Sequence, residues 1–487
     1  MQCFPTREQA RVYARQGYSR MPAAARILSD FTTPIEALRI LKHISSHVYL
    51  LESARENESW GRWSFLGFDP RMEITCLDGR MQMGDVVLET VDPRIQLRQI
   101  MEANQAPCVP GMPPFAGGLV GWFSYDFIRY SEPAAAADVQ DPDAFRDLDL
   151  MLFDKVIAFD HLKQQILLIA SVDLHNLDVS FNRAMLELER MRDLLKTGKK
   201  AEEPAGRLLG EIRPLFDRAT WQEMVENAKR HIYDGDIFQI VLSNRLCAPF
   251  EGSLLDTYRM LRTINPSPYM FYFSGTDVEV AGASPETLVK LEDGRLSTFP
   301  LAGTRRRGNT REEDLMLEKD LLSDAKELAE HDMLVDLGRN DLGRISQIGT
   351  VQVEKYHSIE RFSHVMHLGS TVTSRIRPEL DALDAVGSVL PAGTLSGAPK
   401  IRACQLIGEL EGTKRGIYGG AIGYLDFSGN LDMCIAIRLV YRKNGQVFVR
   451  SGAGIVADSD PDKEYEECLN KARSSLSALV QAQEDLF

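Results

Sequence analysis

The C-terminal part of the chain contains three strand-like segments separated only by short turns. The segments GGAIGYLDF, LDMCIAIRLVYR and QVFVRSGAGIV follow one another, with Ser428–Asn430 and Lys443–Gly445 between them. Segments joined by so few turn residues pair as antiparallel neighbours. This meander therefore predicts antiparallel sheets and argues against a parallel sheet built from strand–helix–strand units.

The rest of the chain predicts more short strands, with amphipathic helices between them. Further strand candidates are Val48–Ser53, Gly118–Asp126, Asp149–Asp160, Gln165–Ser171 and Phe238–Leu246. Apolar residues at helical spacing predict helices over Pro34–Ile44, Asn182–Leu195, Ala219–Ile232, Glu312–Leu337 and Asp462–Gln481. Hairpins outnumber strand–helix–strand units, so we expect an α+β fold of antiparallel sheets with helices packed outside.

A charged stretch divides the chain. The segment TGKKAEEPAGR, at 197–207, is rich in small and charged residues and has no apolar period, which is typical of a linker. We therefore expect an N-terminal domain over 15–196, a linker over 197–212 and a C-terminal domain over 213–487.

Charge and cysteine content exclude several classes of protein. The net charge of −14 argues against a nucleic-acid or anionic-membrane partner, because such partners need basic faces. The seven cysteines are scattered without a CxxC pair, which is typical of a reduced cytosolic protein. The sequence starts without a secretory signal and contains no apolar run long enough to span a membrane, so we expect a cytoplasmic location.

Two predicted helices each carry a pair of glutamates three residues apart. Glu327 and Glu330 would share one helix face, and Glu464 and Glu467 another. Two such faces meeting at one point would suit Mg²⁺, which binds one or two carboxylates and keeps several waters. The alternative is two solvated helix faces, with Lys471 forming an ordinary ion pair with Glu467.

Several further residues stand in unusual surroundings. If Leu431–Arg442 is one strand, Arg438 shares a face with small and apolar residues, where a guanidinium needs a partner such as a ligand carboxylate; the alternative is an edge position with the guanidinium in water. The segments Ser451–Ala457 and Pro391–Pro399 are expected to be loops whose backbone amides face an anion, although either could be a simple turn. The first also scans as a dinucleotide motif, but no helix opens after it, so we reject that reading.

Two histidines and three arginines complete the candidates. His364 and His367 would lie on opposite faces of a strand; such residues are commonly structural, but one facing a cavity can act as a base. Of Arg305, Arg306 and Arg307, we expect one to hold a loop and the others to face solvent or neighbouring acids.

In combination, these motifs resemble those of the chorismate-utilising enzymes. The chain contains, in order, GASPETL, PLAGTRRRG, EHDMLVDLGRNDLGRI, HVMHLGSTV, PAGTLSGAPKIRA, GIYGGAIGY, IAIRLVY and SGAGIVADSDPDKEYEE, across roughly Arg218–Leu479. The segments Leu50–Ser53 and Asn265–Met270 resemble the large subunits of anthranilate synthases within that family. The resemblance implies two antiparallel sheets stacked face to face and wrapped by helices, with the N-terminal unit in the same body.

The resemblance also implies roles for individual residues. Glu330 and Glu467 match Mg²⁺ ligands, with Glu327 and Glu464 behind them, and Glu286 matches the acid that protonates the leaving ring hydroxyl. His367 and Thr394 match residues that line the ring and serve the later elimination. The positions that match chorismate contacts are Gly303, Thr304, Tyr418, Arg438, Gly452, Ala453, Gly454 and Lys471.

Two positions discriminate among the reactions of that family. Aminodeoxychorismate synthases carry a nucleophilic lysine where this chain has Ala302, and isochorismate and salicylate synthases carry a lysine base where it has Gln239. Direct attack by ammonia, which gives anthranilate and pyruvate, is then the expected reaction. The sister enzymes remain the alternative, and a catalytically inactive subunit is disfavoured because the matched site residues are all present.

The resemblance implies an ammonia supplier and an inhibitor. No cysteine lies in a Gly-x-Cys-x-Gly context, so we expect ammonia from a separate glutamine amidotransferase subunit, in a heterotetramer. Tryptophan is the expected feedback inhibitor, which makes the N-terminal domain regulatory and the C-terminal domain catalytic. The residues implied for its site are Glu52, Ser53, Pro268, Tyr269 and Met270, although 265–268 could be only a rigid turn.

Overall fold

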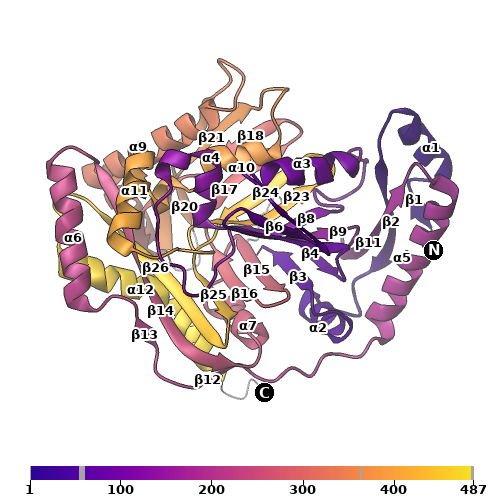
Figure 1. Ribbon diagram of the computed structural model, residues 1–487, viewed down its shortest axis with the longest axis horizontal. Coiled ribbons are helices and arrows are strands. Elements are labelled where there is room, and N and C mark those ends of the chain that lie inside the picture. Colours follow the sequence, from indigo (N-terminus) through magenta and orange to yellow (C-terminus); the bar gives the residue numbers. More distant parts are fainter. Residues whose placement is uncertain (1, 54–60, 362–364, 484–487) are drawn as a thin grey trace.

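The computed structural model describes residues 2–53, 61–361 and 365–483. It contains two large sheets with helices outside them (Figure 1), so the predicted α+β fold is confirmed. Every pair of named strands in the described residues is antiparallel. No helix among these residues is long and apolar enough to cross a membrane.

The larger sheet has 14 strands and joins both halves of the chain. Its order is β1 (Cys3–Phe4), β2 (Arg20–Leu28), β11 (Gln165–Asp173), β10 (Lys155–Asp160), β4 (Trp63–Phe68), β3 (Val48–Glu52), β15 (Tyr269–Ser274), β16 (Glu279–Ser284), β25 (Leu439–Lys443), β26 (Gln446–Ile455), β14 (Gln239–Glu251) and β12 (Arg207–Leu208), with β13 (Arg213–Pro214) and β22 (Gly397–Ala398) also on β14.

The second sheet has 12 strands. Its order is β19 (Leu301–Arg306), β21 (Val365–Arg375), β18 (Arg295–Thr298), β17 (Thr287–Glu292), β24 (Leu431–Ile435), β23 (Ala421–Asp426), β8 (Gly118–Phe123), β9 (Leu148–Phe153), β5 (Met72–Leu77), β6 (Arg80–Met83) and β7 (Val86–Glu89), with β20 (Gln352–Arg361) on β21. N-terminal strands pair with C-terminal ones in both sheets, through β3–β15 and β8–β23. The N-terminal unit is therefore part of the same body, while the domain boundaries remain a prediction.

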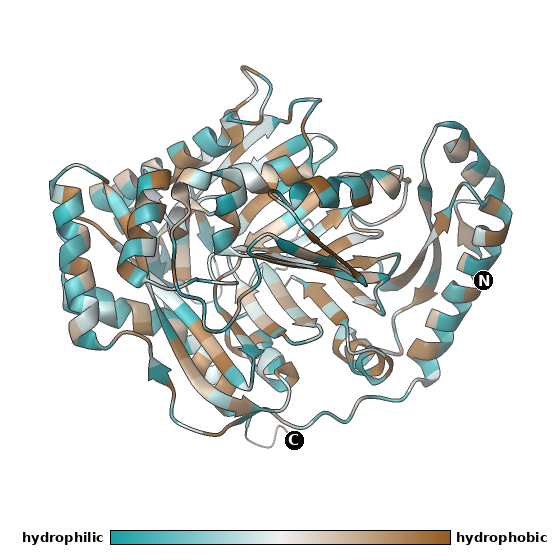
Figure 2. Cartoon of the chain, in the orientation of Figure 1, coloured by the Kyte–Doolittle hydropathy of each residue, from teal (hydrophilic) through white to brown (hydrophobic). Residues whose placement is uncertain are grey.

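The two sheets enclose one apolar core, and helices cover their outer faces. Aromatic rings from the two sheets, such as Phe65, Phe271, Phe153 and Tyr424, are buried in one cluster between them. The helices present hydrophobic residues toward the sheets and hydrophilic ones outward (Figure 2). They are α1 (Arg7–Arg15), α2 (Pro34–Ile44), α3 (Arg94–Ala103), α4 (Ile128–Ser131), α5 (Leu177–Thr197), α6 (Arg218–Tyr233), α7 (Leu255–Ile264), α8 (Arg311–Ser323), α9 (Ala325–Gly343), α10 (Ala382–Val389), α11 (Lys400–Glu411) and α12 (Pro461–Gln481).

The chain passes from one sheet to the other through a short connection without a helix at four places, and two of these overturn strand predictions. Leu431–Arg442 is not one strand: β24 belongs to the smaller sheet and β25 to the larger. Asp149–Asp160 is likewise divided, into β9 and β10. The residues on both sides of each crossing are apolar and buried, and only Asp154 and Lys155 in one case and Arg438 in the other interrupt the run, so hydrophobicity alone does not show the change of sheet. The other crossings are β4 to β5 and β16 to β17.

Two further predictions are corrected by local hydrogen bonds. Glu312–Leu337 is not one helix, because Asp324 ends α8 and its carboxylate accepts from the amides of Lys326 and Glu327 at the start of α9. The predicted loop at 451–457 is mostly strand, since β26 continues to Ile455 and pairs with β14. The predictions for α2 and α12 are confirmed, the latter one residue longer.

Candidate active site

A cavity of about 740 Å³ lies where the two C-terminal crossings meet α9 and α12. The amide of Ile435, at the end of β24, donates to the carbonyl of Glu286, just before β17, at 3.0 Å. The two crossings are thus joined, and Glu286 and Arg438 lie on them. The predicted site residues that line the cavity are Glu286, Gly303, Thr304, Glu327, Glu330, His367, Thr394, Tyr418, Arg438, Gly452, Gly454, Glu464, Glu467 and Lys471.

Glu286 is an acid that keeps its proton at neutral pH. Burial raises its pKa to about 8, and the hydroxyl of Thr394, 3.5 Å from both carboxyl oxygens, only partly offsets this effect. Burial and the Thr394 hydrogen bond, and not a neighbouring charge, set this pKa. Thr394 lies in the short 3₁₀ segment Gly393–Leu395, so the loop after α10 delivers it to the acid. A neutral carboxyl group in a cavity can donate a proton to a leaving oxygen.

A glycine bulge places His367 in the cavity. The register between β19 and β21 shifts between Ala302 and Thr304, and Gly303 adopts a positive φ of 61°. This backbone conformation favours glycine, and a Cβ atom there would also lie 2.9 Å from a Leu321 methyl group. His367 Nδ1 lies 2.9 Å from the carbonyl oxygen of Gly303. Because a carbonyl only accepts, Nδ1 carries the hydrogen and Nε2 carries the ring lone pair of a base.

Arg438 is held in a conformation that non-glycine residues seldom adopt. Its φ is 54°, and it lies between β24 and β25, not within a strand, so the predicted strand face for its side chain is wrong. Burial lowers the pKa of Arg438, and no carboxylate of the described residues forms an ion pair with it. Left-handed backbone at a bulky residue is typical of functional sites. The guanidinium is thus placed to bind an anionic ligand.

The end of β26 forms the opposite wall. Its pairing with β25 stops at Val449, so from there on one backbone edge of β26 is open while β14 pairs with the other. Gly452 and Gly454 share a face, and Cβ atoms there would lie 3.0 Å from the Tyr418 hydroxyl and 2.8 Å from Gln239 Nε2. Ala453 has the opposite orientation and is fully buried in the core beside α6 and α11. A ligand in the cavity could therefore contact only the backbone of Ala453.

The helix wall carries the four predicted carboxylates on one side of the cavity. Burial raises the pKa of Glu330, and Glu327 and Glu467 raise it further. Burial also raises the pKa of Glu464, as does Glu467. One carboxylate oxygen of Glu464, Oε2, is buried without a hydrogen-bond partner. A hard dication would relieve the repulsion between these carboxylates and could bind the oxygen that lacks a hydrogen-bond partner.

These carboxylates fit Mg²⁺ in a particular way. The described residues contain no ready-made group of three or more His, Cys, Asp or Glu ligands. Mg²⁺ does not require one, because it is bound by one or two carboxylates and completes its shell with waters and substrate oxygens. Lys471, on the same face of α12, lies 2.8 Å from Glu467, so the ordinary ion pair is present while both residues line the cavity.

The three consecutive arginines bind acids of their own chain. Arg305 pairs with Asp320 and Asp324, Arg306 with Glu313 and Arg307 with Asp314. They anchor α8 and the start of α9 beside the Gly303 bulge. The expectation that they hold a loop and meet neighbouring acids is confirmed, and none of the three lines the cavity.

The residues implied for the inhibitor lie in and around one strand pair. Glu52 of β3 is opposite Met270 of β15, and Glu52 accepts from the hydroxyl of Tyr258 at 2.6 Å. The Tyr269 hydroxyl donates to Asp432 of β24 at 2.8 Å. Ser53 and Pro268 flank the two strands, so the five residues are adjacent in the fold. His364 lies outside the described residues.

The sequence prediction missed five charged residues of the cavity. Lys326 and Lys463 line it next to the glutamate pairs, Asp458 and Asp460 line it just before α12, and Arg450 lines it from β26. Arg450 could have been predicted, because it lies two residues before Gly452 and so shares a strand face with Gly452 and Gly454. The two lysines carry no comparable signal, since exposed helix lysines are common.

Comparison with known proteins agrees with this geometry. The family model described as chorismate binding enzyme matches residues 46–477. Anthranilate synthase component 1 of Pseudomonas aeruginosa is 43% identical, with 99% of each chain covered. The protein of the same name from Acetivibrio thermocellus is 42% identical, again with 99% of each chain covered.

Solved structures give the same picture. Anthranilate synthase component I from Streptococcus pneumoniae TIGR4 superposes with a TM-score of 0.78 at 39% identity, covering 93% of this chain and 99% of that one. The menaquinone-specific isochorismate synthase MenF from Escherichia coli superposes with a TM-score of 0.70 at 19% identity, covering 97% and 98%. The second likeness shows a shared fold only.

Proposed function

Because this chain belongs to the family of chorismate-binding enzymes, and within it to the anthranilate synthase component 1 proteins, we propose that it converts chorismate and ammonia into anthranilate and pyruvate. This is a carbon–oxygen lyase reaction and the first step of tryptophan biosynthesis. The observation that carries the proposal is Glu286, a carboxyl group that stays protonated at neutral pH inside a cavity that Arg438 and Lys471 also line.

The residues present favour direct attack by ammonia. Neither Ala302, which precedes the Gly303 bulge, nor Gln239 in the β14 wall provides an amine. Ammonia therefore forms the new bond to ring carbon 2 without a covalent enzyme intermediate. The hydroxyl at carbon 4 leaves as water after it takes the proton of Glu286. The lone pair of His367 is placed to accept the carbon-2 proton as pyruvate leaves and the ring becomes aromatic.

Substrate binding falls to the cationic groups. Chorismate is a dicarboxylate, and Arg438 and Lys471 supply a guanidinium and an ammonium group to the cavity. Glu330 and Glu467 would hold Mg²⁺, with Glu327 and Glu464 behind them. When bound, the ion neutralises these carboxylates and attracts a substrate carboxylate. The open backbone edge of β26 and the Tyr418 hydroxyl then orient the ring.

The ammonia supply and its control are part of the proposal. We expect a glutamine amidotransferase subunit as partner, in a heterotetramer, since none of the cysteines lies in the sequence context of a glutaminase nucleophile. Purified alone, the chain should not hydrolyse glutamine but should use ammonium. Tryptophan is the proposed inhibitor, acting by favouring a state that binds chorismate poorly.

One experiment tests the reaction directly. The purified chain is incubated with chorismate, Mg²⁺ and ammonium at mildly alkaline pH, with and without EDTA, and the product is identified by fluorescence and mass. Anthranilate that forms only without EDTA supports both the reaction and the metal. Aminodeoxychorismate, isochorismate or salicylate as the product would refute it.

The inhibitor site has its own test. Isothermal titration of the Ser53→Phe variant with tryptophan should show weaker binding by at least about tenfold, because a bulky ring then competes for the space beside Met270. Anthranilate formation from ammonium without tryptophan is the control for correct folding. Unchanged tryptophan affinity in an active variant would contradict the assignment.

A further inference from the structure

Beneath the cavity, two arginines share a single glutamate. Glu411, near the end of α11, accepts from Arg450 Nη2 at 2.6 Å and from Arg415 Nε at 3.0 Å. It also accepts from the amide of Ser243 at 2.8 Å. The three charged side chains are buried almost completely. Their contacts fix the positions of α11, β14 and β26 relative to one another.

The cluster contains two positive charges and one negative charge, so its own carboxylate balances only one of the two guanidinium groups. Two guanidinium groups face one carboxylate, and neither guanidinium forms an ion pair with a second carboxylate in the part of the chain that the structure describes. Burying an uncompensated charge is costly, and a fold retains it where the charge has a use. Arginine cannot avoid the cost by losing its proton.

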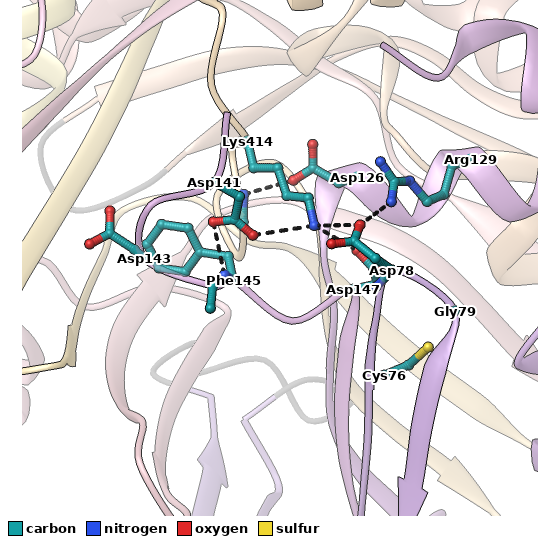
Figure 3. Close-up of polar contacts among 12 residues, drawn as sticks. Cys76, Asp78, Gly79, Asp126, Arg129, Asp141, Asp143, Phe145, Asp147 and Lys414 are labelled. Carbon is teal, nitrogen blue, oxygen red and sulfur yellow. Dashed lines mark hydrogen bonds and ion pairs between the residues drawn. The ribbon is translucent and has the colours of Figure 1, made fainter. Parts of the chain in front are cut away.

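The neighbouring residue shows the opposite balance. Lys414 lies 2.9 Å from Asp78, 3.3 Å from Asp141 and 3.5 Å from Asp147 (Figure 3). Three carboxylates of the N-terminal unit thus surround one ammonium group, with Arg129 pairing with Asp78. The excess negative charge lies on this side, away from the cavity, since none of these residues lines it. The region is therefore polarised, with its positive end toward the cavity.

Arg450 is the part of the cluster that reaches the cavity. It lies on the same face of β26 as Gly452, whose Cβ position points at the Tyr418 hydroxyl. Its three nitrogens donate to Ser243, to the Lys414 carbonyl and to Glu411, which uses three of the five N–H groups of the guanidinium within the chain. Burial raises the pKa of Tyr418, and Arg415 and Arg450 act in the opposite direction, so their charge is felt at the cavity wall.

Arg415 secures the same wall from behind. Its guanidinium donates to the Leu395 carbonyl at 2.6 Å and to the Val241 carbonyl at 2.7 Å. Leu395 follows Thr394, and Val241 is opposite Gly454. Arg415 therefore has a structural task of its own, and Glu411 is sufficient to balance it. The second guanidinium, that of Arg450, then has no carboxylate of its own within ion-pair distance in the described residues, although the buried Asp126 interacts with it electrostatically.

We propose that Arg450 supplies a positive charge, for which it has no carboxylate partner of its own, to the wall of the substrate cavity, and that this charge strengthens binding of an anionic substrate. The inference rests on the proposed function, because it takes the cavity to be the site for the dicarboxylate chorismate. It adds a residue that acts through charge to the residues that contact the substrate.

The test compares Arg450→Gln with Arg450→Lys, using KM and kcat with ammonium and chorismate binding by calorimetry. Arg450→Gln leaves Glu411 and Arg415 as a balanced pair, so we expect a folded protein with little change in kcat. KM and Kd for chorismate should rise about tenfold, as expected for loss of one charge about 10 Å away at an effective dielectric of about 20. Arg450→Lys, which keeps the charge, should bind chorismate nearly as well as the wild type.

Arg245→Gln is the matched control. Arg245 is opposite Arg450 in the β14–β26 ladder and is similarly buried, but it pairs with Asp143 and does not line the cavity. Chorismate binding should be unchanged in this variant. The inference fails if Arg450→Gln binds chorismate like the wild type, or if folded Arg450→Lys loses as much affinity as Arg450→Gln. If the wild type itself neither binds nor converts chorismate, the proposed function fails first.

Discussion

Each half of the chain contains a pair of direct crossings between the two sheets, and the two pairs differ in whether their charged side chains form an ion pair. In the N-terminal unit β4 passes to β5 and β9 returns to β10; in the C-terminal unit β16 passes to β17 and β24 returns to β25. Each outgoing crossing contains a proline followed by a charged residue, Arg71 in one case and Glu286 in the other. Each returning crossing also carries a charged residue, Asp154 or Arg438.

In the N-terminal crossing the charges satisfy each other. Arg71 Nε lies 3.8 Å from Asp154, and its Nη1 donates to Asn104 at 3.1 Å. In the C-terminal crossing no ion pair joins Glu286 and Arg438 within the described residues. Burial instead raises the pKa of the acid, and the arginine has a strained backbone.

The difference separates structure from function. A crossing exposes the ends of two strands from each sheet and opens space between the sheets. Where an acidic and a basic side chain form an ion pair in that space, the crossing only joins the sheets. Where they are kept apart, the crossing has an unsatisfied donor and an unsatisfied acid that a substrate can use.

The largest expected effect is the loss of the acid. Glu286→Gln cannot protonate the leaving hydroxyl, so anthranilate formation with ammonium should fall by about 10²–10⁴-fold. Chorismate binding should change little, because the neutral amide resembles the neutral carboxyl group in size and charge. Asp154→Asn, at the other crossing, should keep nearly wild-type activity. Comparable losses in the two variants would show that both crossings serve only stability.

Loss of the unpaired arginine should have the next largest effect. Arg438→Gln removes a charge-assisted contact to a substrate carboxylate, so KM for chorismate should rise about 10–100-fold. Arg438→Lys should recover little, because lysine cannot form the two parallel hydrogen bonds of a guanidinium. Arg71→Lys is the control and should leave KM unchanged. A wild-type KM in Arg438→Gln would contradict the assigned role.

The crossings also mark the limit of what the sequence predicts. Hydrophobic alternation and turn residues predicted antiparallel sheets and the positions of many of the longer, buried strands, because these strands bury at least one face. Alternation could not reveal that Leu431–Arg442 changes sheets at 436–438, since both parts are apolar and buried. The face assigned to Arg438 was therefore wrong, although the resemblance implied a chorismate contact at Arg438 independently of that face.

The resemblance predicted which residues form the site, but the sequence did not predict their burial, pKa values or charged partners. Spacing alone placed Glu327 with Glu330 and Glu464 with Glu467, but their convergence on one cavity depends on tertiary packing. The raised pKa of Glu286 comes from burial by residues distant in sequence. The sharing of Glu411 by Arg415 and Arg450 joins a helix end to a strand, and no local pattern predicts it.

A smaller effect concerns pH. The pKa of Glu286 is raised to about 8, so the proton that the acid donates is present below that pH and is lost above it. At a constant concentration of free ammonia, kcat should fall about tenfold per pH unit above about pH 8. The residual activity of Glu286→Gln should show no such fall. Because no charged neighbour sets the pKa of Glu286, excess Mg²⁺ should not move the midpoint; a midpoint that follows Mg²⁺ would assign the titration to the helix carboxylates.

The smallest expected effect lies in the N-terminal crossing. Arg71 and Asp154 are each about one-third exposed, at 38% and 33%, and their 3.8 Å separation is long for an ion pair. Solvent screens such pairs, so Asp154→Asn should lower the free energy of unfolding by at most about 1 kcal/mol and leave KM and kcat unchanged. Denaturant unfolding together with steady-state kinetics measures both quantities on the same sample. A change in KM at nearly wild-type stability would mean that this crossing also reaches the substrate, and the division into a satisfied crossing and a reactive one would no longer hold.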